Sequence, residues 1–315
     1  MFVEVVVTKR NGFAGPMALL LVWQLAACKA SEEATQDQKP TVSTVSAPSW
    51  EAGKRYLYAT DLKSKLSAAG RPLTGFVMSA ALALETRQAG AETEYLAGLF
   101  DIKLTAEKPE NQEQFAALAR ELSAPFGFST VDGKLSSVML RPEWSAFAAS
   151  IARTLAAGLQ FVERQADQPA ANVWTASETD ATGTYTAEYT ATGPTGPLSK
   201  RKLRYENIPL GKLGIAQLSG GVKPEVLESK GSLLLGDAPG RPRIARVEYG
   251  EKLKLQVSPT SLVHSETELV LAFKPNEQRA STLDWTTALA GLSLIHISEP
   301  TRLRRSSYAV FCLKK

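Results

Sequence analysis

Side chains alternate between apolar and polar along most of the chain from Trp50 to Phe273, and this two-residue period constrains the fold more than any other feature. Between Leu96 and Leu104, for example, one face is apolar while Asp101 and Lys103 fall on the other. Such alternation predicts antiparallel strands with one face toward a core and one toward water. Clusters of Gly and Pro separate the runs and mark turns. The predicted strands cover residues 55–66, 74–88, 96–104, 134–140, 173–178, 184–191, 200–205, 230–235, 243–257 and 266–273.

One segment breaks this period. Apolar side chains recur at three- and four-residue steps between Glu143 and Glu163, the opposite face is mostly alanine, and Arg153 is the only charge between them. A helix that is apolar nearly all round is buried. With strands before and after it, the pattern predicts a mainly β, α+β fold: an antiparallel barrel-like sheet around one buried central helix at about residues 143–163. An ordinary amphipathic helix is predicted over residues 111–122.

The last 24 residues, Leu292–Lys315, do not fit this pattern. Back-translation of Leu292–Arg302 gives codons similar to the transposase end and adapter arm of a tagmentation sequencing library. The run Ser307–Lys315 resembles the flow-cell primer end of the same library. A segment of this origin carries no information about the native fold. We therefore expect residues 292–315 to be adapter-derived and not native, the alternative being a real basic amphipathic tail.

The tail accounts for the basic character of the chain. The formal net charge is +4, but the tail carries five of the 36 Lys and Arg residues and one of the 32 acidic residues. Residues 1–291 therefore hold 31 of each. The sequence also lacks a Lys/Arg stripe, zinc-ligand spacing and an aromatic RNA-binding pattern. We therefore expect no nucleic-acid partner.

The same tail contains one of the two cysteines and one of the two histidines, which leaves Cys28 and His264. One cysteine forms no intramolecular disulfide, and one histidine forms no histidine-based metal cluster. A Ser–His–Asp triad would have to use His264, but the chain has no Gly-x-Ser-x-Gly elbow to supply the serine. His264 lies in a strand-like run, and we interpret it as a strand histidine near the surface. Glu178 and Asp180 lie in a predicted hairpin and are interpreted as turn and surface residues. We predict no enzyme activity, no metal and no cofactor.

The N-terminus has the pattern of a targeting signal. A basic Thr8–Arg10 segment precedes a short apolar core and then Leu25-Ala-Ala-Cys28, which resembles the bacterial lipobox. This resemblance implies a signal peptide over residues 1–27 and an acylated mature N-terminus at Cys28, the alternative being an ordinary secretory signal. In bacterial lipoproteins, an aspartate directly after the acylated cysteine favours retention in the inner membrane. Lys29 occupies this position here, so the resemblance implies that the protein is anchored in the outer membrane. Residues 28–49 are polar, lack periodicity and are expected to form a disordered tether.

Short motifs follow one another in the predicted β domain. They are Pro125-Phe-Gly-Phe128 before Asp132-Gly133, a helix end at Gly158-Leu-Gln160, Glu178-Thr-Asp180-Ala-Thr-Gly183 with the later Tyr189, and Lys200-Arg-Lys202. Their order resembles the N-terminal domain of large lipid transfer proteins, the vitellogenin/apolipoprotein B group. The resemblance implies a barrel-like antiparallel sheet wrapped around a central helix, over residues 50–285.

The sequence departs from that family in two places. Animal domains place paired cysteines in the hairpin region, where this chain has Tyr185 and Tyr205, so cross-strand aromatic packing is expected to replace the bridges. In the family, helical repeats and lipid-cavity sheets follow the barrel. Residues 286–291 are therefore expected to begin a helical region that the adapter-like tail cuts short.

The resemblance and the lipid anchor together imply an outer-membrane lipoprotein with a lipid-binding or lipid-transporting role. The alternative is a non-catalytic envelope docking or assembly domain that binds a protein partner. The expected partners are the membrane through acylated Cys28, a lipid, and, under the alternative, an envelope protein.

Overall fold

The computed structural model describes residues 50–164, 172–193, 196–207, 223–236, 241–258, 261–275 and 291–296. The signal peptide, Cys28 and the tether predicted over residues 1–49 lie outside these ranges, as do residues 286–290 and most of the adapter-like tail. Everything below concerns the described part of the chain.

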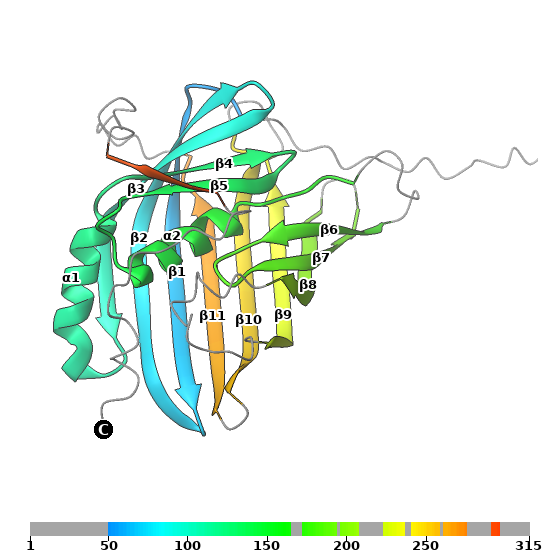
Figure 1. Ribbon diagram of the computed structural model, residues 1–315. Coiled ribbons are helices and arrows are strands. Elements are labelled where there is room, and N and C mark those ends of the chain that lie inside the picture. Colours follow the sequence, from blue (N-terminus) through cyan, green and yellow to red (C-terminus); the bar gives the residue numbers. More distant parts are fainter. Residues whose placement is uncertain are drawn as a thin grey trace, which may run out of the picture. The chain divides into compact units, whose positions relative to one another are not determined.

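The strands form a single antiparallel sheet (Figure 1). Their order across it is β12-β5-β4-β3-β2-β1-β11-β10-β9-β8-β7-β6, so that the first strand along the chain pairs with the eleventh. The fold class predicted from the two-residue period is confirmed: the protein is mainly β, with a barrel-like antiparallel sheet and two short α-helices. The strands are β1 (Arg55–Ala68), β2 (Arg71–Ala89), β3 (Glu92–Ala106), β4 (Phe126–Val131), β5 (Lys134–Leu140), β6 (Val173–Thr179), β7 (Thr184–Ala191), β8 (Leu198–Asn207), β9 (Lys223–Leu235), β10 (Ile244–Ser258), β11 (Ser261–Phe273) and β12 (Ser293–His296).

Two-residue turns fix the register of the first hairpins. Ala69 and Gly70 join β1 to β2 with φ of 49° and 75°, and Asp132 and Gly133 join β4 to β5 with φ of 52° and 78°. Two successive left-handed residues form the hairpin turn whose twist matches that of the flanking strands. Asp-Gly is one of the preferred pairs for such a turn, so the local sequence favours the β4–β5 hairpin.

Helix α1 (Gln112–Leu122) follows a short 3-10 turn, η1 (Pro109–Asn111), and lies beside the sheet (Figure 1). It buries Phe115, Leu118 and Leu122, which recur at three- and four-residue steps on one face. This helix agrees with the prediction for residues 111–122.

Helix α2 (Ala146–Gly158) is the predicted central helix, but it is shorter than the predicted 143–163 at both ends. It begins late because Ser145 is its N-cap: the Ser145 side chain accepts a hydrogen bond from the Ala148 amide at 3.2 Å. It ends early because the residues from Gln160 onward bond to the edges of the sheet instead of continuing the helix. Periodicity could not show this, because the apolar pattern continues past the end of the helix.

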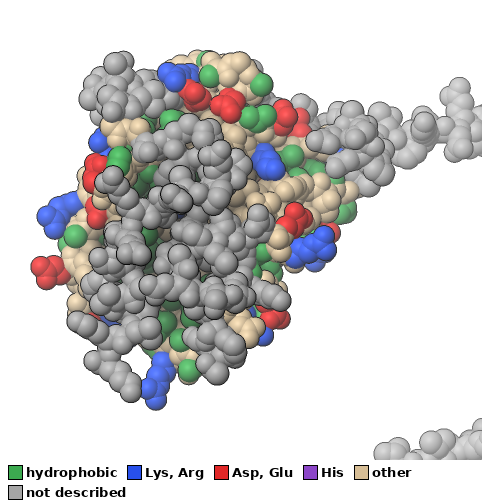
Figure 2. Space-filling model, in the orientation of Figure 1, with side chains coloured by type: hydrophobic (Ala, Val, Ile, Leu, Met, Phe, Trp, Pro, Cys, Tyr) green, Lys and Arg blue, Asp and Glu red, His purple; other side chains and the backbone are tan. Residues whose placement is uncertain are grey.

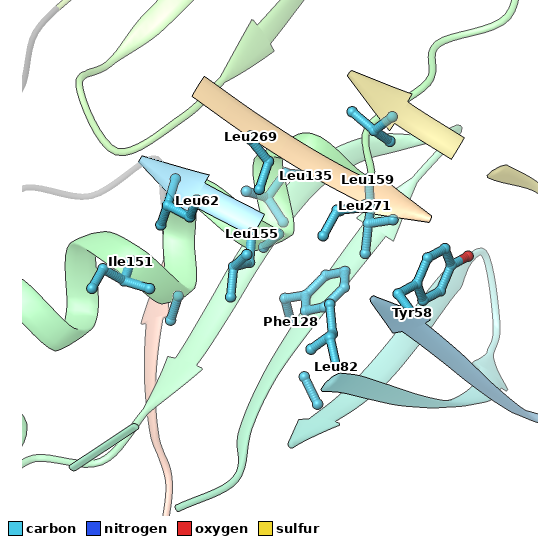
Figure 3. Packing of buried hydrophobic residues seen from close by; sticks show 14 of the residues in the cluster. Tyr58, Leu62, Leu82, Phe128, Leu135, Ile151, Leu155, Leu159, Leu269 and Leu271 are labelled. Carbon is cyan, nitrogen blue, oxygen red and sulfur yellow. The ribbon is translucent and has the colours of Figure 1, made fainter. Parts of the chain in front are cut away.

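The apolar face of α2 packs against the sheet and fills the core (Figure 3). Ile151 and Leu155, together with Leu159 just beyond the helix, are buried members of the same core cluster as Leu269 of β11. A Cβ atom on Gly158 would come within 2.6 Å of the Leu269 Cδ2 atom, so a larger residue there would push the end of the Leu269 side chain aside. The expectation of a buried helix is confirmed for this face.

Charged side chains of both signs are interspersed over the described surface seen in Figure 2. Among the described helices, none has the length and apolar character needed to cross a membrane.

The beginning of the adapter-like segment pairs with the edge of the sheet. Residues Ser293–His296 form β12, antiparallel to β5, with Ser293 opposite Leu140 and His296 opposite Ser137. A sheet edge offers unpaired backbone groups to any extended segment, whatever its origin. The pairing therefore does not require that this segment evolved with the domain.

Removing residues 292–315 is expected to change the free energy of unfolding by less than about 1 kcal/mol, because β12 is four residues long and has one neighbouring strand. Hydrogen exchange should speed up selectively in Ser137–Leu140. Urea unfolding and amide exchange of the shortened and full chains would measure both effects. A loss of several kcal/mol would show that this segment is part of the fold.

Candidate functional site

The predicted site residue Cys28 lies outside the described residues, so its acylation stays a prediction. His264 is exposed on β11, as interpreted from its strand-like surroundings. The described residues contain no group of three or more His, Cys, Asp or Glu side chains placed to hold a metal ion. The candidate site instead lies where the sheet closes.

The sheet closes through the segment Leu159–Glu163, here called the seam. Gln160 is completely buried and bridges two strands that do not pair with each other. Its Oε1 atom accepts a hydrogen bond from the Leu135 amide of β5 at 3.0 Å, and its Nε2 atom donates to the Thr179 carbonyl of β6 at 2.7 Å. One amide side chain thus replaces a pair of ladder hydrogen bonds.

Phe161 holds the seam to the β4–β5 turn. Its amide donates to the Gly133 carbonyl at 3.2 Å. A Cβ atom on Gly133 would lie 1.8 Å from the Phe161 carbonyl oxygen, so glycine is required here for close approach as well as for its positive φ. Arg243, directly before β10, forms an ion pair with Glu163 at 2.9 Å, and its guanidinium lies over the Phe161 ring.

Trp174 and Tyr189 hold the other side of the seam. The two rings are stacked with centroids 5.2 Å apart. The Trp174 indole N–H donates to the Val162 carbonyl at 3.0 Å, and the Val162 amide donates to the Tyr189 hydroxyl at 3.4 Å. The seam is therefore bonded to β4–β5 on one side and to β6–β7 on the other.

A buried carboxylate lies next to the seam. Glu178 of β6 is completely buried and accepts hydrogen bonds from the hydroxyls of Tyr185, at 2.7 Å, and Tyr189. The Lys200 ammonium of β8 lies 2.6 Å from Glu178 and also donates to the Gln160 carbonyl at 3.1 Å. Both carboxylate oxygens therefore have partners, and Lys200 connects the buried ion pair to the seam.

A second buried ion group lies two residues farther along the same strands. The Lys202 ammonium contacts Asp180 and lies 2.5 Å from Glu251 of β10. Tyr205 donates to Asp180 at 2.8 Å, and Tyr249 donates to Glu251. The ammonium also lies over the rings of three tyrosines, at centroid distances of 4.5 to 5.3 Å.

Asp180 also shapes the β6–β7 turn. Its Oδ1 atom accepts hydrogen bonds from the amides of Thr182, at 2.6 Å, and Gly183, at 2.9 Å. Its other oxygen faces Lys202 and Tyr205. The carboxylate therefore joins the local turn to the buried ion group.

These contacts correct the interpretation of Glu178 and Asp180 as turn and surface residues. Asp180 does form the turn, but neither carboxylate faces water: the Glu178 side chain is 0% exposed and that of Asp180 is 9% exposed. The signal that could have revealed this is the matching i, i+2 spacing of Lys200 and Lys202, which puts both ammonium groups on the same face of a nearby strand.

Tyr185 and Tyr205 are cross-strand partners with ring centroids 5.6 Å apart. The expected cross-strand aromatic packing of these two residues is observed, whereas its correspondence to a disulfide of the family stays a prediction. Such a pair contributes about 0.5–1.5 kcal/mol beyond its burial.

The environment shifts the pKa values of these groups in different directions. Burial raises the pKa of Tyr185 and Tyr189 well above the usual range, and the Glu178 charge raises it further. Burial lowers the pKa of the Lys200 ammonium, which the attraction of Glu178 only partly offsets. Burial also disfavours the charged form of Lys202, but Asp180 and Glu251 outweigh it and hold the pKa of this ammonium well above its usual range.

We expect cooperative alkaline unfolding. A tyrosine or lysine whose folded pKa is raised stabilises the fold below its unfolded pKa, about 10 to 10.4, and this stability is lost as the pH rises toward the folded pKa. All seven described tyrosines and Lys202 act in this direction, whereas Lys200 acts in the opposite one. In a Tyr308→Phe chain, phenolate absorbance at 295 nm should appear together with the loss of circular dichroism. A smooth native titration near pH 10 would contradict this.

The arrangement binds the buried charges to one another, and both carboxylate oxygens of Glu178 are engaged by Tyr185, Tyr189 and Lys200. A shallow surface depression of about 290 Å³ lies elsewhere, beside Tyr58, Ala81 and Lys103, where β3 carries an extra residue opposite β2. It is open, and its lining also includes Ser79, Asp101 and Lys274. The buried ion groups are therefore best described as the closure of the barrel.

Comparison with known proteins finds no matching family model and no matching curated protein. Among solved structures, the chain is similar to one described as "Lipid-protein interactions in lipovitellin", with a TM-score of 0.48 and 13% sequence identity. The similarity covers 75% of this chain and 27% of the solved chain. The chain thus spans about a quarter of the length of that protein.

Proposed function

We propose that the described domain is a rigid, non-catalytic scaffold of a lipid-handling protein. The observation that carries this proposal is the packing of α2 against the sheet, together with the closure at Gln160. Helix α2 occupies the inside of the sheet, and Gln160 bonds β5 to β6 where the two strands do not pair. Since packed side chains take up the space between α2 and the sheet, we infer that contacts with other molecules are made by the outer faces and rims of the sheet.

We further propose that acyl chains on Cys28 hold this scaffold at the bacterial outer membrane, on a tether formed by residues 28–49. Support comes from the lipobox-like Leu25-Ala-Ala-Cys28 and from Lys29 after it. Labelled palmitate should enter the natural chain and be absent from a Cys28→Ser chain, which should also leave the membrane fraction. Equal labelling of both chains would overturn the anchor.

Direct lipid binding by the domain is the second candidate. It is favoured by aliphatic side chains that remain exposed on several strands, among them Val77 of β2 at 52% and Leu227 of β9 at 49%. Such residues offer apolar contact at the surface without a cavity. Scattered single residues of this kind are also common on soluble proteins, so this candidate is the weaker one.

One experiment separates the two candidates. The full chain with Cys28→Ser is delipidated, incubated with membrane extract, repurified and examined by mass spectrometry for retained lipid. The scaffold proposal expects less than one lipid per chain, together with reproducible cross-links to a protein partner from photoreactive residues on the outer strand faces. Stoichiometric retained lipid would overturn it in favour of lipid carriage.

A further inference from the structure

The edge of β5 is used in two different ways along its length. Near its start, the Leu135 amide donates to the Gln160 side chain of the seam at 3.0 Å. From Ser137 to Leu140, the same edge instead carries β12, which pairs with it antiparallel. The seam therefore closes the sheet at one end of β5, and the other end is left to whatever extended segment comes beside it.

Local structure sets the limits of this second part, Ser137–Arg141, here called the open edge. An extra residue, Ser136, interrupts the pairing of β5 with β4 and separates the open edge from the part that the seam holds. At the other end, the Arg141 carbonyl accepts a hydrogen bond from the Trp144 amide at 3.1 Å, and Pro142 has no amide proton to offer. The open edge thus has the length of a short added strand.

Strand β12 shows that the open edge accepts a strand. It pairs in a defined register, with Ser293 opposite Leu140 and Ile295 opposite Val138. Its sequence belongs to the adapter-like tail, which we expect not to be native. On that expectation, a segment that was never selected for this contact still pairs here, so the open edge binds through backbone groups that any extended chain can supply.

Arg141, at the end of the open edge, adds a side-chain preference. Its Nε atom is buried and makes no hydrogen bond within the described part of the chain. Its ion pair with Glu143 is 3.9 Å long, and the Glu143 side chain is 67% exposed to water. The Nε atoms of Arg55 and Arg243 are also unbonded, but each of these side chains has a carboxylate within 3.0 Å. Arg141 is therefore the one of these three that can take a further carboxylate.

An added strand brings one of its residues directly beside Arg141. Continuing the β12 register places position 292 opposite Arg141, and directly opposite residues point to the same face of a sheet. The chain that enters β12 already passes close to the guanidinium, since a Cβ atom on Gly291 would lie 2.8 Å from the Arg141 Nη1 atom. An acidic residue at position 292, where the tail has leucine, would thus come within reach of Arg141.

We propose that the open edge binds an extended segment of a protein partner as an added antiparallel strand, with an acidic residue of that segment opposite Arg141. Backbone hydrogen bonds to Ser137–Leu140 supply the pairing, and the carboxylate fixes the register by meeting the guanidinium. Because the added strand is antiparallel, the acidic residue precedes the paired residues in the partner's sequence. The site rests on the scaffold function proposed above, of which it is one protein contact.

The test uses two full-length chains, both carrying Cys28→Ser so that no acyl group takes part. One keeps the tail as it is. The other, here called the open-edge chain, also carries Leu294→Pro and Ile295→Pro. Neighbouring residues of a strand direct their amides to opposite sides, so one of these prolines removes a donor from the pairing and releases the open edge. NMR titration of the Ser137–Leu140 amides measures peptide binding.

Three peptides, blocked at both ends, are compared: the tail segment of residues 291–297, the same segment with Leu292→Glu, and this glutamate peptide with Leu294→Pro and Ile295→Pro. The glutamate peptide is expected to bind the open-edge chain about 10-fold more tightly than the tail peptide, the effect of one charge-assisted contact. The proline peptide should not bind. The chain with the intact tail should bind the glutamate peptide about two- to fivefold more weakly, because β12 competes for the same edge.

Arg141→Met assigns the acidic preference to one side chain. In the open-edge chain it should abolish the difference between the glutamate and tail peptides while leaving the affinity for the tail peptide unchanged. Arg120→Met, which removes an exposed arginine on α1, is the matched control and should keep the difference. If Arg141→Met fails to fold, a peptide with Leu292→Gln takes its place. Equal affinities of the glutamine and glutamate peptides would then overturn the role of Arg141.

The site is overturned if the glutamate peptide leaves the Ser137–Leu140 amides of the open-edge chain unchanged, or if the proline peptide binds as well as the glutamate peptide. Equal affinities of the glutamate and tail peptides would overturn the acidic preference. The scaffold function is judged by its own experiment. Partner cross-links without peptide binding reject the open edge alone, whereas stoichiometric retained lipid without cross-links rejects the scaffold even where the peptides bind.

Discussion

Replacing Lys202 by methionine is expected to lower the free energy of unfolding by about 3–5 kcal/mol, the effect of removing one partner from a buried ion group. Asp180 and Glu251 would then face each other without a cation, and three tyrosine rings would lose the ammonium above them. Urea unfolding at neutral pH, followed by circular dichroism, measures the loss. Adding Glu251→Gln to the same chain should recover part of it, because one of the two opposed charges is removed.

Lys230→Met is the control for this prediction. Lys230 also pairs with a glutamate on a strand, Glu228 at 3.2 Å, but its side chain is 77% exposed. Exposed ion pairs contribute little to stability, so the free energy of unfolding should change by no more than about 0.5 kcal/mol. If the two lysine variants lost similar amounts of stability, burial of the ion group would not be the cause.

Replacing Gln160 by leucine is expected to cost about 2–6 kcal/mol, because two buried backbone groups lose their partners at about 1–3 kcal/mol each. The Leu135 amide and the Thr179 carbonyl would remain buried and unbonded, since the apolar side chain offers neither a donor nor an acceptor. Urea unfolding gives the free energy, and faster hydrogen exchange at the Leu135 amide would locate the damage at the seam.

Gln112→Leu is a close control for Gln160→Leu. The Gln112 side chain also bridges two backbone groups, accepting from the Ala106 amide at 3.0 Å and donating to the Leu104 carbonyl at 3.1 Å. Gln112 is exposed, so water can replace both bonds and the cost should be below about 1 kcal/mol. A loss as large as that of Gln160→Leu would mean that the position in the seam is unimportant.

Much of the sheet could be predicted because alternation is a local property. The runs at 134–140 and 184–191 match β5 and β7 at both ends. The β9 strand begins at Lys223, seven residues before its predicted start. The prediction missed these residues because a bulge at Leu227 interrupts the two-residue period there. Pairing of β1 with β11 joins residues about two hundred positions apart, and no local pattern specifies it.

The candidate site was harder to predict than the strands. Glu178, Asp180, Lys200 and Lys202 were visible as a motif, but charged residues are almost never fully buried unless paired, so a surface position was the default expectation. Their partners, Glu251 above all, come from a distant strand. Gln160 was visible only as the end of the Gly158-Leu-Gln160 motif, and a lone glutamine at the end of an apolar helix does not show that it will join two strand edges.

The seam has a consequence for how such a barrel can vary. In a barrel closed by strand pairing alone, the number of strands and their stagger must agree around the whole circumference. Here side chains of an irregular segment complete the circle between β5 and β6, so the ladder never returns to its starting strand. The circumference is thereby released from a fixed stagger, so a strand added or removed at either edge of the sheet would leave the register of the other strands unchanged.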